Sequence, residues 1–310
     1  MRTRAGHLYF GGEAMSCSLR SLNSFPKPPL TIEEQIELLR QRKLIIENEE
    51  FAKEVLNSVS YYRLSGYTLS LRAGNLFHEG VTFRSVYQIY EFDRKLRHLL
   101  LGVIEVVEIA LRTQIANHMA LKYGALGYLN SSYFRDPLFH QEFLLELQKQ
   151  IKNTKNKELF IRHYIEKYNG KFPIWAAVEI FSLGMLSKFF KNLKIEDQKA
   201  ISRGYYDFPP QYLVSWIHAL VTLRNICAHY GRLYNRTFTI TPKLSKEIKK
   251  LGFLDDRLFT YIFILKYLIR SRKKWISFST NLQAIIAEYK DEVDISLVGF
   301  PCNWYEILLS

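Results

Sequence analysis

An arginine and a histidine, Arg224 and His229, stand five residues apart close to the end of a predicted helix. The planar guanidinium of an arginine binds a phosphate through several donors at once. An imidazole can accept and release a proton near neutral pH. Side chains of these two types, held at one phosphodiester, can cleave RNA without a metal ion.

The helix that must position this pair is predicted to begin at Pro209 and Pro210, because proline is favourable in the first turn of a helix. Apolar residues follow at the three-four spacing of a core-facing helix: Leu213, Ile217, Leu220 and Leu223. Gly231 is predicted to end the helix in a left-handed conformation. Five residues separate two side chains by roughly 140° on a regular helix. We therefore expect either an unwound turn near Ala228 or a second copy of the protein that completes the site.

A purely structural interpretation of the pair remains open. Arg224 would then pair with a carboxylate and His229 would cap the helix end, and spacing alone favours this view because Arg-X4-His is short and common. A second arginine and histidine, Arg112 and His118, occur in a long helical pattern. There Glu108 lies one turn before Arg112, so an ion pair within the helix is the favoured interpretation.

Several ordered segments carry a resemblance to a known family. Residues 224–229 (RNICAH), with 231–236 (GRLYNR) after them, resemble the signature of the Abi-like (abortive infection, AbiD and AbiF type) bacterial proteins, which belong to the HEPN superfamily of helical ribonucleases. The likeness extends over most of the chain through these segments: 27–31 (KPPLT), 60–67 (SYYRLSGY), 90–97 (YEFDRKLR), 110–115 (ALRTQI) and 170–175 (GKFPIW).

The resemblance implies an all-α fold, with a HEPN-like helical bundle core and additional N- and C-terminal helices. It also implies metal-independent endonucleolytic cleavage of RNA, in which a ribose 2′-hydroxyl attacks the adjacent phosphorus and leaves a 2′,3′-cyclic phosphate and a 5′-hydroxyl. In this reaction His229 would transfer a proton and Arg224 would bind the phosphate charge. Asn225 would orient the substrate or donate a hydrogen bond to a phosphate. No cofactor is implied.

Candidate RNA-binding residues follow the pair directly. Tyr230 is a candidate for stacking on a base, and Arg232, Asn235 and Arg236 are candidates for holding the flanking strand. HEPN sites often draw polar groups from a neighbouring helix. Three residues on the long helical pattern are therefore expected as supporting groups: Glu105, Glu108 and Arg112.

A second candidate RNA-binding surface lies near the C-terminus. Arg272, Lys273 and Lys274 stand beside Trp275, and such a mixture of basic and aromatic residues suits a phosphate backbone with a stacked base. A charge run of this kind is more often only a solvated surface.

The family context implies phage defence by abortive infection, with a homodimer whose two motif copies face each other. RNA is the expected partner, as substrate and, as for some relatives, as a bound small non-coding RNA. Two other classes of function remain open: an RNA-binding or regulatory module without catalysis, and a toxin that acts on proteins or on a membrane. The Arg224 and His229 pair favours the nuclease.

Composition narrows the class of partner. The 310 residues carry a formal net charge of +13, with a pI of about 9.5, which favours a polyanion such as nucleic acid.

The three cysteines, Cys17, Cys227 and Cys302, are odd in number and widely spaced, so neither a disulfide framework nor a zinc site is predicted. This fits a reducing cytoplasm. Cys227 is expected to be a small buried residue rather than a nucleophile. No apolar stretch reaches the roughly 20 residues of a membrane helix.

The chain divides into four predicted parts. Residues 1–14 are interpreted as a tag or upstream extension, 15–30 as an extended leader, 31–240 as the HEPN-like core, and 241–310 as a C-terminal helical extension packed on the core. A capping box at Thr31 and Glu34 is expected to start the first helix.

Further helices are expected at 51–60, 61–70, 83–123, 173–190, 242–251 and 272–289, and a loop at 72–82.

Overall fold

A computed structural model describes residues 27–154, 156 and 158–310. The predicted extension at 1–14, and the part of the predicted leader up to residue 26, lie outside these residues. No helix in the described part is long and apolar enough to span a lipid bilayer. The chain there is mainly helical, with one short hairpin, so the all-α class predicted from the sequence is confirmed.

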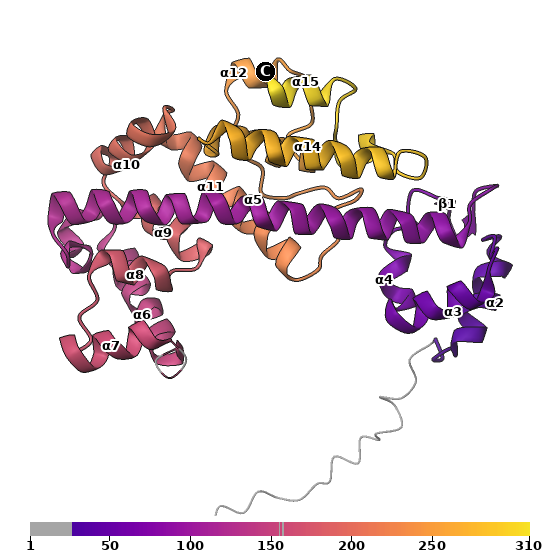
Figure 1. Cartoon of the computed structure of the whole chain (residues 1–310), viewed down its shortest axis with the longest axis horizontal. Helices are drawn as coiled ribbons and strands as arrows, with labels where there is room; N and C mark the ends of the chain where they lie inside the picture. Colours follow the sequence, from indigo (N-terminus) through magenta and orange to yellow (C-terminus); the bar gives the residue numbers. More distant parts are fainter. Residues whose placement is uncertain (1–26, 155, 157) are drawn as a thin grey trace, which may run out of the picture.

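One long helix, α5 (Phe83–Tyr123), runs the length of the molecule, and the other elements pack along it (Figure 1). Its first turn is capped by Thr82, whose hydroxyl accepts a hydrogen bond from the Ser85 amide. At its other end Gly124 adopts a φ of 80° and ends the helix. At 41 residues the helix is about 60 Å long. The predicted bounds, 83–123, are confirmed.

The N-terminal group packs at one end of α5. It consists of α2 (Ile32–Gln41), α3 (Glu49–Ser58), α4 (Tyr61–Ser65) and the hairpin of β1 (Arg72–Ala73) and β2 (Leu76–Phe77). The capping box predicted at the start of α2 is confirmed, because the Thr31 hydroxyl and the Glu34 carboxylate each accept the other residue's amide hydrogen. Two predictions are corrected here: α4 ends at Ser65 instead of Ser70, and the predicted loop contains an antiparallel pairing of Arg72 with Phe77.

A second group packs at the other end of α5. It consists of 3-10 turns η1 (Gly127–Leu129) and η2 (Ser131–Tyr133), then α6 (Pro137–Thr154), α7 (Leu159–Tyr168), α8 (Ile174–Ile180), α9 (Leu183–Asn192), α10 (Ile195–Ile201) and the π-helical turn η3 (Ser202–Tyr206). The single helix predicted at 173–190 is wrong. Phe181 is extended, and the Ser182 hydroxyl accepts a hydrogen bond from the Met185 amide and starts a new helix.

The motif helix, α11 (Pro210–Ala228), begins at the predicted prolines and packs on α5 and α9. After it come α12 (Lys246–Lys249), α13 (Leu258–Leu268), α14 (Arg272–Glu288), η4 (Ile295–Val298) and α15 (Trp304–Leu309). Of the helix predicted at 242–251, only the four residues of α12 are helical. α14 lies along the side of α5 opposite the N-terminal group (Figure 1).

Candidate functional site at the end of helix α11

Helix α11 remains regular to its last residue. The amide of His229 donates to the carbonyl oxygen of Asn225 at 3.0 Å, which is an ordinary α-helical bond. The helix therefore does not unwind near Ala228, and that explanation of the 140° separation is wrong. The second explanation, a second copy of the protein, stays a prediction.

The turn after the helix is closed by two backbone bonds. The Tyr230 amide donates to the Cys227 carbonyl at 3.1 Å, and the Gly231 amide donates to the Ile226 carbonyl at 2.7 Å. This is a Schellman motif, in which the residue after the cap is left-handed. The left-handed residue is Tyr230, with a φ of 59°, so the prediction that Gly231 would take this conformation is wrong.

Gly231 is required for a different reason. A Cβ at this position would lie 2.9 Å from Ile226 Cγ2 and 3.2 Å from the Ile226 carbonyl oxygen, so only glycine lets the chain pass this close to the helix. The left-handed conformation costs Tyr230 roughly 1–2 kcal/mol. Arg63 of α4 helps to hold it, because its Nη1 donates to the Tyr230 carbonyl oxygen at 2.8 Å.

The two candidate catalytic side chains are almost without partners in the part of the chain that the structure describes. Arg224 is half-buried, and among the described residues its side chain makes only a long hydrogen bond, 3.4 Å, to the Asn225 side-chain oxygen. His229 is exposed, and its imidazole makes no hydrogen bond or ion pair within residues 27–154, 156 and 158–310. The structural interpretation is borne out at His229, which is the C-cap of α11. It also required a carboxylate at Arg224, and none of the described residues provides one. Both side chains are therefore available to a ligand.

A buried carboxylate, Asp93 of α5, fixes the loop that follows. It accepts hydrogen bonds from the backbone amides of Leu233 (3.0 Å) and Tyr234 (2.7 Å) and from the Tyr67 hydroxyl (2.8 Å). Arg97, one turn along α5, forms an ion pair with it. Burial raises the pKa of the Asp93 carboxyl, and Arg97, Tyr67 and the two amides oppose this shift by stabilising the carboxylate. Moving the loop would leave the buried Asp93 carboxylate without its two amide donors. A change in the conformation of the loop would therefore cost free energy.

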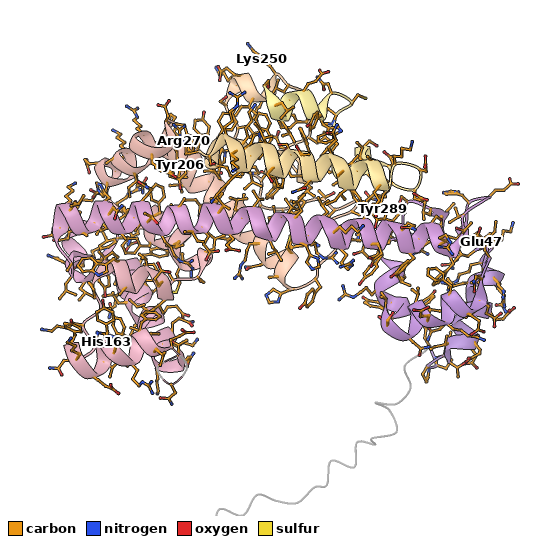
Figure 2. All side chains as sticks on the ribbon, viewed as in Figure 1. Glu47, His163, Tyr206, Lys250, Arg270 and Tyr289 are labelled. Atoms are coloured by element: carbon orange, nitrogen blue, oxygen red, sulfur yellow. The ribbon has the colours of Figure 1, made fainter. Side chains whose placement is uncertain are left out.

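Helix α14 and the residue after it support the same region through Phe92 of α5. The ring of Phe92 packs edge-on against Tyr234, with centroids 6.4 Å apart, and against Tyr289, at 5.9 Å. Tyr289 follows the end of α14 and lies over α5 (Figure 2). Lys95 adds an ion pair to Glu288 at 2.5 Å. The C-terminal segment thus contributes to the position of the motif loop.

Three segments that are distant in sequence therefore meet at this site: 60–67, 90–97 and 224–236. Sequence reasoning gave no role to Arg63, Tyr67, Asp93 or Arg97. A signal was present, because all four lie inside segments that resemble the family, and an aspartate four residues before an arginine on a helix suggests an ion pair. The target of that pair, a loop 140 residues away, had no local signal.

A pocket of about 350 Å³ opens beside the motif, between α4, α5 and the end of α11. Its lining includes Arg63 from α4, Tyr90, Arg94 and His98 from α5, and Cys227 and Tyr230 from the motif segment. Pockets that hold small ligands begin at about 300 Å³, so this one is large enough for a nucleotide.

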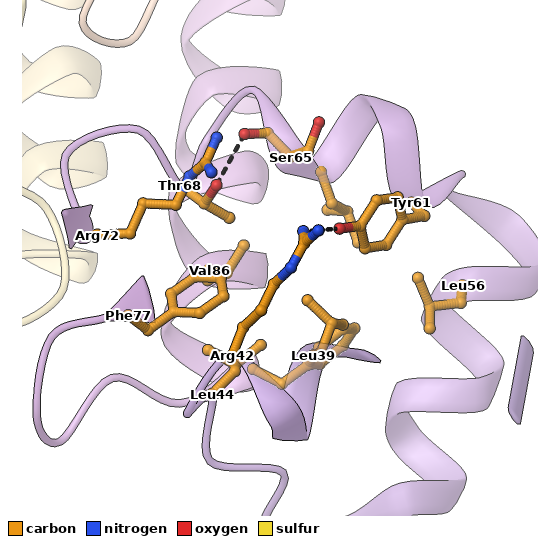
Figure 3. A pocket seen from close by; sticks show the side chains of 12 residues that line it. Leu39, Arg42, Leu44, Leu56, Tyr61, Ser65, Thr68, Arg72, Phe77 and Val86 are labelled. Atoms are coloured by element: carbon orange, nitrogen blue, oxygen red, sulfur yellow. Dashed lines mark hydrogen bonds between the residues drawn. The ribbon is translucent and has the colours of Figure 1, made fainter. Parts of the chain in front are cut away.

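A smaller cavity lies within the N-terminal group (Figure 3). Arg42 enters it and donates to the Tyr61 hydroxyl at 2.6 Å. The rest of the lining combines apolar side chains such as Leu56 with the polar Thr68 and Arg72. Its volume, about 30 Å³, has room for a water molecule but not for a nucleotide. We therefore regard it as a packing feature of this group.

The basic residues after the motif are partly engaged within the loop. Arg232 donates to the Tyr234 and Asn235 carbonyls at 2.5 and 3.1 Å, and Arg236 donates to the Arg232 carbonyl at 3.3 Å. Asn235 is left-handed, with a φ of 49°. Carbonyl partners do not neutralise an arginine, so contact of these residues with RNA stays a prediction, as does contact through the exposed Tyr230.

The second candidate surface is corrected in one respect. Trp275 is buried, and its indole donates to the Leu308 carbonyl at 2.8 Å, so it offers no surface for stacking a base. Arg272, Lys273 and Lys274 are exposed at the start of α14, and an RNA contact there stays a prediction.

Of the predicted supporting groups on α5, Arg112 binds another element, α8. Arg112 pairs with Glu108 at 2.6 Å, as predicted, and donates to the carbonyl oxygens of Val178 and Phe181 at the end of α8 at 3.1 and 2.7 Å. Glu105 is exposed. Arg112 and Glu108 thus hold α8 on α5, and a part for them in the motif site stays a prediction.

Other chemistry at the motif is limited by burial. Cys227 is 1% exposed, and burial raises the pKa of its thiol to about 12, so it is not an activated nucleophile. No cluster of three or more His, Cys, Asp or Glu side chains within the described residues could hold a metal ion.

Comparison with known proteins gives one match. The family model for Abi-like protein matches residues 54–235, more than half of the chain. The matched range contains the first two of the segments that meet at the end of α11, 60–67 and 90–97, and the third up to Asn235. No curated protein and no solved structure matches the chain.

Proposed function

The chain belongs to the Abi-like protein family, which implies a role in abortive infection against phage, and we propose that it is a metal-independent endoribonuclease of HEPN type. One observation carries this proposal: Arg224 and His229 stand at a rigidly closed helix end with almost no protein partners among the described residues. Side chains that serve the fold are normally paired, as Arg112 is. Unpaired ones at a fixed site suit a ligand.

The proposed reaction is transfer within the RNA strand. The ribose 2′-hydroxyl loses its proton and attacks the adjacent phosphorus, and the bond from phosphorus to the 5′-oxygen of the next nucleotide breaks. The products are a 2′,3′-cyclic phosphate and a 5′-hydroxyl. We assign the proton transfer to His229, the growing phosphate charge to Arg224, and orientation of the phosphate to Asn225.

We further propose that the site is shared between two copies of the chain. Because α11 is regular to Ala228, Arg224 and His229 of one protomer point in directions roughly 140° apart. A symmetric dimer with the two helix ends facing each other would bring Arg224 of one copy towards His229 of the other.

Cleavage in EDTA tests the reaction. Purified protein and an Arg224→Ala/His229→Ala variant are incubated with a mixed-sequence labelled RNA, and the product ends are identified. We expect cleavage by the wild type alone, with cyclic phosphate ends. RNA bound but left intact by both proteins would instead favour a non-catalytic or RNA-regulated binding module, and co-purifying RNA would then be sequenced.

Mixing two inactive variants tests the shared site. If each site takes Arg224 from one copy and His229 from the other, random pairing of Arg224→Ala with His229→Ala restores about a quarter of the sites. Two sites each built within one copy would give no recovery. Sedimentation of the same mixture at the assay concentration establishes whether dimers are present.

A further inference from the structure

The pocket beside the motif contains more positive charge than its neighbours neutralise. Arg94 is held by both oxygens of Glu91, at 2.8 to 3.0 Å, and Arg97 is paired with the buried Asp93. Arg63 differs from both, because its partner is the neutral carbonyl of Tyr230. Within the described residues no carboxylate pairs with Arg63, and most of its five donors have no partner there, so it can bind an anion.

His98 is the second group available to a ligand. It lies one helical turn after Arg94 on α5, is exposed, and lines the same pocket as Arg63. Its imidazole makes no hydrogen bond or ion pair within the described part of the chain. Arg63 and His98 come from different elements, α4 and α5, so the fold alone brings them to one pocket.

The rim of the pocket carries two aromatic side chains, Tyr230 and Tyr90. Tyr230 is 66% exposed, although its backbone is held by the helix cap and by Arg63. Tyr90, on the α5 side, packs edge-on against Tyr67 with centroids 5.5 Å apart. An exposed ring on a fixed backbone turn beside an arginine suits an unpaired base whose phosphate the arginine binds.

We infer that this pocket binds one nucleotide of a single-stranded RNA, adjacent to the phosphate at Arg224, with its backbone phosphate at Arg63 and His98 and its base on Tyr230. The inference rests on the proposed function for its choice of RNA. It adds a binding site on α4 and α5 that lies outside the motif helix. The bond from Arg63 to the Tyr230 carbonyl also joins this nucleotide site to the turn that carries His229.

A non-cleavable ligand tests the pocket without depending on catalysis. The probe is a mixed-sequence oligonucleotide with 2′-fluoro sugars, which lacks the attacking hydroxyl, titrated against the full chain in EDTA at several salt concentrations. We expect Arg63→Ala/His98→Ala to lose about 10- to 100-fold in affinity. The slope of log affinity against log salt should also fall by about 0.7 for each phosphate contact that is lost.

The matched control is Arg162→Ala/His163→Ala. These residues form an exposed Arg-His pair on α7, in the group at the other end of α5, where Figure 2 labels His163. The control removes the same charges, and we expect its affinity to stay within about twofold of the wild type. His98→Ala alone leaves the Tyr230 carbonyl bond untouched, so its loss of affinity cannot come from a loosened turn.

The outcomes separate the pocket from the reaction. Equal affinity and equal salt slope for the wild type and the Arg63→Ala/His98→Ala variant would overturn the pocket, even if ordinary RNA is cleaved. If that variant loses affinity but the wild type does not cleave ordinary RNA, the inferred nucleotide site is supported and the proposed nuclease activity is contradicted. A control variant that loses as much affinity as the pocket variant would also overturn the inference.

Discussion

Two arginine and histidine pairs with similar spacing have opposite surroundings in this protein. In the last third of α5, Arg112 is bound by Glu108 and by two carbonyls at the end of α8, and His118 contacts Asp197 at 2.7 Å. At the end of α11, Arg224 has one long hydrogen bond, and the His229 imidazole has none within the described residues. Spacing does not distinguish the pairs, but the number of protein partners does.

The difference follows from where each pair stands. Arg112 and His118 lie where α5, α8 and α10 pack together. Burying their N–H groups there without acceptors would cost free energy. The second pair lies at a helix end, where the closing turn is held by the backbone of Tyr230 and Gly231 and by Asp93. The fold is thus held rigid around Arg224 and His229 without using their side chains.

The largest expected effect concerns the rate of cleavage. His229→Ala should lower the rate about 10²- to 10⁴-fold, or roughly 3 to 5 kcal/mol of barrier, if His229 transfers a proton. His118→Ala should keep the wild-type rate per folded molecule, because its partner Asp197 lies outside the motif segment. Single-turnover cleavage of labelled RNA measures both rates. Equal losses of rate in His229→Ala and His118→Ala would contradict the view that only the pair at the end of α11 is catalytic.

The next effect concerns stability. Arg112→Ala should lower the free energy of unfolding by about 2 to 3 kcal/mol, since it leaves Glu108 and two carbonyls without their donor. Arg224→Ala should change it by no more than about 0.5 kcal/mol. Urea denaturation followed by circular dichroism measures both values. If Arg224→Ala is destabilised as much as Arg112→Ala, Arg224 serves the fold and not a ligand.

Asp197 allows the structural pair to be tested by pH. Burial alone would raise the pKa of Asp197, but hydrogen bonds from Lys122, His118 and Tyr123 together lower it below its usual value. A lowered pKa gives stability that is complete above the unfolded value of about 4 and is lost as the pH falls through the folded value. Asp197→Asn should therefore be about 2 kcal/mol less stable than the wild type at pH 7, with a smaller difference below pH 4.

Thermal denaturation at a series of pH values measures this difference. Asp291→Asn, at an exposed position, is the matched control and should follow the wild type at every pH. A gap between Asp197→Asn and the wild type that stays constant down to pH 3 would contradict the assignment.

The smallest effect concerns the strained turn. Tyr230→Gly should raise stability by up to about 1 kcal/mol, because glycine adopts the left-handed conformation freely. It should also weaken RNA binding, since the ring on the pocket rim is removed. Asn169→Gly, at the left-handed cap of α7, changes a residue that tolerates this conformation and should have little effect on either. Thermal shift and RNA titration provide the two measurements, and a Tyr230→Gly protein with wild-type affinity would remove the stacking role.

Local features were predictable from the sequence by itself. The bounds of α5, the capping box at Thr31, the prolines that start α11 and the pairing of Glu108 with Arg112 all depend on residues within about one helical turn. The helix break at Phe181 was not predicted, because the apolar helical period of 173–190 continues on both sides of Ser182. Such a pattern gives no sign that Ser182 is the N-cap of a new helix.

The candidate site was predictable only in part. Arg224 and His229 could be named from spacing and resemblance, whereas the groups that hold their turn could not. Arg63 reaches Tyr230 across 167 residues, and Asp93 reaches Leu233 across 140, so no local pattern links them. Tertiary structure alone decided these contacts, because a buried carboxylate and a strained turn find partners from whichever elements the core brings beside them.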